Sequence, residues 1–167
     1  MTHPIVDQIR FARSEFVRGL SDLSEEAAAT RVGPANSISW TVGHLAWQEQ
    51  RYWLQRLAGV TLIPELDREY CFGCPPSSPP LATSWDRWRH ITDASDPVLE
   101  NITEDTLAVD PIVDGSPIGT TFGSMALRVI YHYWYHLGEA MGIRQALGHT
   151  GLAEYVGAID EQAPYRR

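Results

Sequence analysis

Two histidines stand four residues apart in the segment YHYWYHLGEAMG, at positions 132 and 136. In a helix, side chains with this spacing lie one turn apart on the same face, so the imidazoles of His132 and His136 can converge on a point beside the helix axis. Such a pair can bind a divalent metal ion. The spacing is also compatible with core or surface histidines, so a metal site needs support from another segment.

A third histidine, His44, lies in the segment SWTVGHLAWQ between Trp40 and Trp47. Side chains from facing helices meet in the core of a helical bundle. Three imidazoles are the ligand number of open catalytic zinc sites, in which water or substrate takes the remaining position. Buried histidines without a metal would need polar partners that a tryptophan-rich core does not readily supply. We therefore expect His44, His132 and His136 to bind one divalent metal ion.

The metal itself is less constrained, because three imidazoles accept several first-row transition metals. Zinc and nickel are the ions we expect first.

The remaining histidines have no comparable setting. His3 lies at the start of the chain, His90 follows an arginine, and His149 follows a glycine, so we expect all three to be solvated. Glu139 follows the histidine pair at helical spacing. It could accept a hydrogen bond from a ligand, but its place on the polar side favours a surface charge. Gln48, one turn after the first histidine, could hydrogen-bond a ligand or fill space.

Apolar residues recur at helical spacing in four long segments. Ser37 or Asn36 can cap the second segment and Gly59 can end it, while a threonine and an aspartate three residues apart form a variant capping box for the third. The expected helices run from Pro4 to Gly19–Ser21, from about Ser37 to Gly59, from Thr83 onward, and from Thr121–Ser124 to Leu147.

The connections complete the expected architecture. A long loop rich in proline and glycine separates the second and third helices, roughly from Val60 to Leu81, and loops of this length often cover a site. We expect Pro97 to kink or break the third helix, either a short hairpin or an extended excursion around Asp114-Gly115, and a short fifth helix over 152–160. The sequence thus predicts an all-α fold, an antiparallel four-helix bundle formed by a single domain over residues 1–167.

The charge balance argues against nucleic acid as a partner. The formal net charge is −8, and no segment gathers basic residues into the stripe that a phosphate backbone requires. The same balance disfavours an anionic membrane surface. Charged residues interrupt the N-terminal segment, and no stretch approaches the roughly 20 apolar residues of a membrane span. We therefore expect a cytoplasmic protein whose partner is a small molecule.

The two cysteines, Cys71 and Cys74, lie in the loop segment YCFGCPPSSPP. A CxxC pair can be a redox pair or half of a zinc site, but no second CxxC is present in the sequence, and prolines stand where a thioredoxin-type motif needs a helix. We interpret them as two reduced loop thiols that are not metal ligands.

The segments NSISWTVGHLAWQEQRYW and YHYWYHLGEAMGIRQALGH resemble the two signature helices of the DinB-like (YfiT-like) superfamily. Members of that superfamily are four-helix bundles with a histidine on the second helix and a His-x-x-x-His pair on the fourth. The resemblance implies ligand roles for His44, His132 and His136. Some relatives are metal-dependent transferases or isomerases that use low-molecular-weight thiols such as mycothiol, bacillithiol or glutathione, and many have no known activity.

Three functions are compatible with this pattern: an enzyme, a binding protein without catalysis, and a purely structural helical module that holds no metal. In the first, the protein is an enzyme whose metal activates a thiol or water toward a small electrophile, as in a thiol-dependent S-transferase or isomerase. Trp47, Arg51 and Tyr133 are the candidate substrate-binding residues, although packing or surface solvation explains each of them equally well. In the second, the protein binds a metal or small ligand without catalysis.

We also expect a homodimer. Six tryptophans and a fourth helix that is apolar around much of its circumference leave more apolar surface than one small bundle needs to bury.

Overall fold

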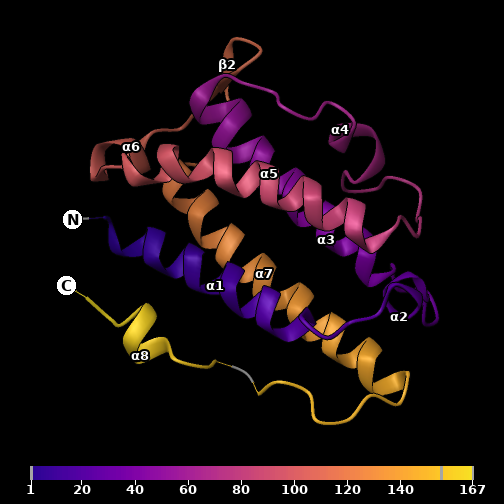
Figure 1. Ribbon diagram of the computed structural model, residues 1–167. Helices are drawn as coiled ribbons and strands as arrows, with labels where there is room; N and C mark the ends of the chain where they lie inside the picture. Colours follow the sequence, from indigo (N-terminus) through magenta and orange to yellow (C-terminus); the bar gives the residue numbers. More distant parts are fainter. Residues whose placement is uncertain (1, 155, 167) are drawn as a thin grey trace.

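The computed structural model describes residues 2–154 and 156–166. Within this part of the chain, four long helical segments form a bundle and short elements connect them (Figure 1). The long segments are α1 (Pro4–Leu20), α3 (Ile38–Glu49) continued by the π-helix η1 (Gln50–Ala58), α5 (Leu81–Glu100) and α7 (Phe122–Ala146). The short elements are α2 (Glu25–Ala29), α4 (Leu66–Glu69), α6 (Glu104–Ala108), β1 (Ile112–Val113), β2 (Ser116–Pro117) and α8 (Ile159–Gln162). The all-α prediction is confirmed.

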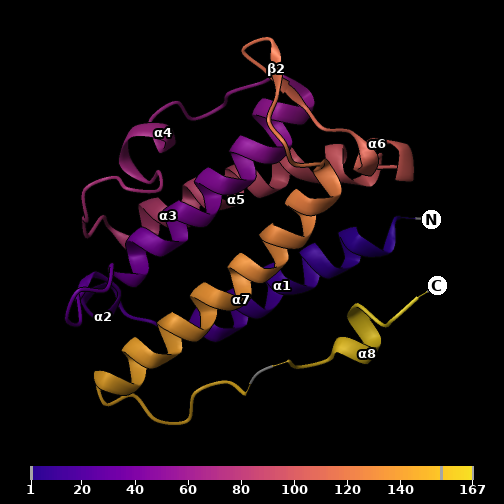
Figure 2. The same ribbon diagram turned by 180° about the vertical axis from the view of Figure 1, so that it is seen from behind.

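The helices run in two parallel pairs, and the two pairs are antiparallel to each other. Phe11 packs against Trp134 and the Arg144 side chain donates to the carbonyl of Gly19, so α1 and α7 advance in the same direction. Helices α3 and α5 advance together in the opposite direction (Figures 1 and 2). The antiparallel prediction therefore holds between the pairs, and the helices within each pair are parallel.

The parallel pairing explains the long loop. A chain that leaves η1 must return along the bundle before it can begin α5, and residues 59–80 make this return alongside α3 (Figure 2). The buried amide of Gln50 holds the start of the loop, because its Oε1 accepts the N–H groups of Leu62 and Ile63 at 3.1 and 2.8 Å. The loop therefore stays close to the face of α3 that carries His44.

Two helix starts and one helix end agree with the sequence signals. The hydroxyl of Ser37 accepts the N–H of Trp40, and the hydroxyl of Thr121 accepts the N–H of Ser124. Gly59 ends η1 with a φ of 72°, a left-handed conformation that glycine adopts without steric cost. Of the two alternatives expected around Asp114-Gly115, the structure has the hairpin, with Ile112 paired to Pro117.

Helix α5 differs from its prediction at both ends. It starts at Leu81 rather than Thr83, because the carboxylate of Glu25 accepts the N–H groups of Leu81 and Ala82 at 2.7 and 2.9 Å and replaces a local cap. The helix also continues past Pro97 to Glu100. Pro97 is exposed, so water can reach the carbonyl left unpaired one turn earlier.

The predicted C-terminal helix over 152–160 is wrong in position. The helix at this end of the chain is α8 (Ile159–Gln162). Tyr155, within the predicted range, lies outside the described residues. A tertiary contact competes with the helix, because the N–H of Gly157 donates to the Glu15 carboxylate at 2.9 Å. Val156 also adopts a φ of 53°, which a helix does not allow.

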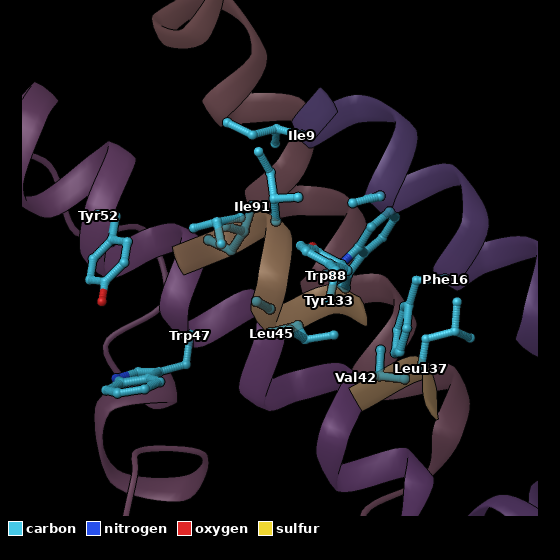
Figure 3. Close-up of a cluster of buried hydrophobic side chains, with 14 of the residues drawn as sticks. Ile9, Phe16, Val42, Leu45, Trp47, Tyr52, Trp88, Ile91, Tyr133 and Leu137 are labelled. Carbon is cyan, nitrogen blue, oxygen red and sulfur yellow. The ribbon is translucent and has the colours of Figure 1, made fainter. Parts of the chain in front are cut away.

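The core fills the space between the four helices. Phe16, Val42, Leu45, Trp88, Ile91, Tyr133 and Leu137 gather there (Figure 3). In the same view Trp47 and Tyr52, which belong to the same cluster of buried side chains, lie apart from this group. Trp47 contacts His44 and so marks the side of α3 that carries the site. Among the described residues, no helix combines the length and the apolar character that crossing a membrane requires.

Candidate metal centre

Helices α3 and α7 bring the three predicted histidines together. His44 comes from α3, and His132 and His136 come from successive turns of α7. Each offers one ring nitrogen to a group of atoms that all lie within 4.8 Å of one another. His44 and His136 are buried, and His132 is half-buried. The cluster therefore has one side partly open to solvent.

Each imidazole is oriented by a hydrogen bond at Nδ1. The Nδ1 of His44 lies 2.6 Å from the carbonyl oxygen of Tyr70. The Nδ1 of His132 lies 2.8 Å from Oε1 of Gln48, and that of His136 lies 2.8 Å from Oε2 of Glu139. These three oxygens are acceptors, so each Nδ1 carries the ring proton and donates it.

This arrangement leaves a lone pair on Nε2 of each neutral ring. The Nε2 atoms of His132 and His136 face each other at 2.9 Å. Two lone pairs at that distance repel each other, and a cation that both can bind relieves the repulsion. An acceptor on the other ring nitrogen is the usual partner of a metal-binding histidine. The donor set therefore fits a divalent metal ion.

Burial favours the neutral, ligand-competent form of two rings. It lowers the pKa of His44 to about 4, and the neighbouring His136 acts in the same direction. Burial also lowers the pKa of His132 to about 3, with further contributions from His136 and His44. The hydrogen bond from His136 lowers the pKa of Glu139, which stays ionised. At neutral pH, protons therefore do not compete with a metal for His44 and His132.

Two indoles fix His44 and the loop at the same time. The His44 ring lies between those of Trp40 and Trp47, at centroid distances of 4.7 and 5.2 Å. Trp40 donates its indole N–H to the carbonyl of Glu69, and Trp47 donates to the carboxylate of Asp67. Both acceptors belong to α4, which immediately precedes Tyr70. The helix and the loop thus position His44 together.

The candidate substrate-binding residues fall into two places. Trp47 contacts His44, and the guanidinium of Arg51 lies 5.2 Å from the centre of the Trp47 ring, so both are beside the cluster. Tyr133 is 1% exposed and lies in the core. The structure does not place its hydroxyl at the open side of the histidine cluster.

Tyr133 belongs to a buried network. Its hydroxyl donates to Glu49 at 2.9 Å and accepts the indole N–H of Trp88 at 2.7 Å. Arg13 donates twice to the same Glu49 carboxylate, at 2.7 Å each, and once to Asp96. This network ties α1, α3, α5 and α7 together beside the centre.

The sequence interpretation missed two of the orienting groups. Glu139 was expected to be a surface charge, and it instead accepts from His136, a pairing that the spacing of three residues on a helix allows. The carbonyl of Tyr70 gave no signal, because any residue can provide a backbone acceptor. The open alternative for Gln48 is resolved in favour of a hydrogen bond to a candidate ligand.

The cysteines and the remaining histidines need corrections. Cys71 and Cys74 form a disulfide, so the prediction of two reduced thiols is wrong. The short CxxC spacing within a turn of the loop brings the sulfurs together. His3 is partly buried and caps α1 by accepting the N–H of Ile5, and His149 accepts from Arg144. His90 is exposed, as expected.

The fold and the site together define a class of protein, a helical bundle with a three-histidine cluster between two of its helices. The chain belongs to the DinB superfamily, whose family model matches residues 8–140. This range includes His44, His132 and His136. A search of curated proteins finds no match to the chain.

Proposed function

We propose that the protein binds one divalent metal ion, zinc or nickel, through His44, His132 and His136, and uses it in the reaction of a low-molecular-weight thiol with a small electrophile. One observation carries the metal site. All three Nδ1 atoms are engaged by acceptors, so three Nε2 lone pairs remain for one ligand. Membership of the DinB superfamily supports the same ligand set.

When bound, a divalent cation of this kind lowers the pKa of a thiol or water molecule that joins its coordination shell and so supplies a nucleophile at neutral pH. In the transfer that we propose, the thiolate sulfur forms a bond to an electrophilic carbon, and the leaving group departs with the electron pair. Three protein ligands leave a position for the thiol, as in catalytic zinc sites.

The residues around the cluster have separate tasks in this proposal. Tyr70, Gln48 and Glu139 hold the imidazoles in one orientation, so a ligand meets a site that is already arranged. The Trp40 and Trp47 rings cover two sides of His44 and exclude water there. We propose that Trp47 and Arg51 also contact the substrate, since they lie at the edge of the cluster.

The metal site is tested by replacing each histidine with alanine. His44→Ala, His132→Ala and His136→Ala should each abolish tight zinc binding, because a site with two protein ligands must complete its shell with water. His90→Ala is the matched control, since His90 is exposed on α5. Metal content and zinc affinity are measured on untagged protein. Full-affinity zinc binding by the His44 variant would contradict the proposal.

The reaction is tested separately from the metal. Zinc-loaded and nickel-loaded protein is incubated with mycothiol, bacillithiol or glutathione and a panel of small electrophiles, and conjugates are detected by mass spectrometry. We expect a conjugate whose rate falls at least a hundredfold in His132→Ala. A protein that binds the metal but accelerates none of these reactions would instead be a metal-binding or ligand-binding member of the superfamily.

We also propose that the protein is a homodimer. Apolar side chains remain exposed around the hairpin, among them Val109 at 49% and Ile112 at 62%. Light scattering of dilute protein should give twice the chain mass of 18.7 kDa. A monomer mass at every micromolar concentration would exclude this assembly.

A further inference from the structure

Three arginines beside the candidate centre have no acidic partner among the described residues. All thirteen basic residues of the chain are arginines, in a protein with a net charge of −8. Most of those described make ion pairs with carboxylates; examples are Arg13, Arg87 and Arg144. The exceptions near the histidines are Arg51, Arg56 and Arg128, which form no salt bridge within the described part of the chain. Three arginines without an acidic partner thus lie together at this place, in a protein with a net negative charge.

Contacts across the helix interface place these arginines in one region. Arg51 lies over the ring of Trp47, which in turn stacks on His44. Arg56 lies over the ring of Tyr52, 5.1 Å from its centre, and reaches α7, where its Nη1 contacts the sulfur of Met125.

Arg128 lies one turn further along α7, and it lines a shallow groove together with Tyr131, His132 and Tyr135. The groove lined by Arg128 is therefore also lined by a candidate metal ligand, His132.

Two acids beside the candidate centre are engaged with other partners. The two carboxylate oxygens of Asp67 accept from the Trp47 indole and from the side-chain amide of Gln55. Glu139 accepts from His136. Partial burial lowers the pKa of Arg56, and the charges of Arg51 and Arg128 act in the same direction. The mutual repulsion of these arginines costs free energy, and an anion placed among them removes that cost.

We propose that Arg51, Arg56 and Arg128 bind an anionic oxygen group, a carboxylate or a phosphate, on the substrate of the three-histidine centre. A guanidinium matches the planar edge of either group with two parallel N–H donors, and it is less strongly hydrated than an ammonium ion. The aromatic rings under Arg51 and Arg56 hold the guanidinium planes without neutralising their charge. This proposal rests on the proposed function, because it names the substrate class of the same site.

Calorimetric titration tests the proposal without an activity assay. Zinc-loaded protein is titrated at constant ionic strength with inorganic phosphate, with succinate, and with the uncharged succinamide. We expect saturable binding of phosphate or of succinate and none of succinamide, and the anion that binds more tightly identifies the group. Arg56→Gln and Arg128→Gln should each weaken anion binding at least tenfold while zinc affinity stays unchanged.

The control is Arg31→Gln. Among the described residues Arg31 likewise has no acidic partner and donates to the carbonyl of Ala35, but it lies in the connection between α2 and α3. Its variant should bind the anion as the wild type does. Equal weakening in all three variants, or anion binding that survives in both Arg56→Gln and Arg128→Gln, would overturn the proposal. If the wild type fails to bind zinc, the proposed function fails first; if it binds zinc but no anion, only the substrate class fails.

Discussion

The ring of Tyr70 occupies the space that a side chain on residue 43 would fill. A Cβ added at Gly43 would lie 2.1 Å from Cε1 of Tyr70, closer than any real contact allows. Tyr70 is 1% exposed, and its carbonyl is the acceptor for Nδ1 of His44. The absence of a side chain at Gly43 therefore lets the loop reach the ring of the next residue on α3.

Gly43→Ala should weaken zinc binding. The methyl group must displace Tyr70, which costs about 1–3 kcal/mol of stability by overpacking, and the displaced carbonyl no longer orients His44. Loss of such an orienting partner lowers metal affinity by roughly 10–100-fold. Zinc affinity is measured by competition with a chelator, and stability by urea denaturation. Gly142→Ala is the control, because nothing lies within 4 Å of its added Cβ. Wild-type zinc affinity in Gly43→Ala would mean that the contact between Tyr70 and His44 does not contribute to metal binding.

Glu139→Gln should reduce zinc affinity about tenfold, the lower end of the range for an orienting partner. The amide keeps an oxygen that can accept from His136, but it loses the negative charge that favours a cation nearby. Asp93→Asn removes an exposed carboxylate from α5 and serves as the charge control. The zinc affinity of both variants is measured by competition with a chelator at constant ionic strength. An unchanged affinity in Glu139→Gln would mean that the carboxylate acts only as a surface group.

The metal-free protein should lose stability as the pH falls below about 6.5. His44 and His132 have pKa values of about 4 and about 3 in the folded protein, below the ordinary 6.5. Between these values the unfolded chain binds protons that the folded chain does not, so the free energy of unfolding decreases as the pH falls from 6.5 to 4. Urea denaturation of chelator-treated protein at several pH values measures this slope. His132→Ala should show a shallower slope over the same interval, and an identical slope would contradict the assignment.

Removing the positive partner of Glu49 should destabilise the bundle without affecting the metal. Glu49 is fully buried and accepts two hydrogen bonds from Arg13. Arg13→Met leaves that carboxylate uncompensated, which costs about 3–5 kcal/mol. Arg10→Met breaks exposed ion pairs with Asp96 and Glu100 and should cost under about 1 kcal/mol. Urea denaturation gives both values. A loss of zinc stoichiometry in folded Arg13→Met would show that the network also shapes the centre.

The sequence was most informative where periodicity and chemistry agreed. Helical spacing and the expectation of a facing helix predicted that His44, His132 and His136 lie close together. Ser37, Gly59 and Thr121 marked helix ends through local hydrogen bonding and backbone conformation. These signals lie within a few residues of the feature that they predict. They require no knowledge of how distant segments meet.

The errors arose where a distant residue decides the local structure. Glu25 caps α5 across 56 positions of sequence, and Glu15 accepts from Gly157 in the segment that was expected to be helical. The parallel pairing of α3 with α5 also depends on the path of the loop. The carbonyl of Tyr70 belongs to the same category, since backbone acceptors have no residue signature.

The π-helical winding of η1 determines the direction in which the side chains near the centre point. A π-helical turn contains an extra residue compared with an α-helical turn. An α-helical repeat over Gln50–Ala58 would use one residue fewer per turn, so at the same chain length Arg56 would be rotated about the helix axis by about 100° relative to His44. The histidines would stay in place, while Arg56 and its neighbours would face elsewhere. The winding of this segment therefore affects which ligands a bundle of this kind selects, without any change to a residue of the histidine cluster.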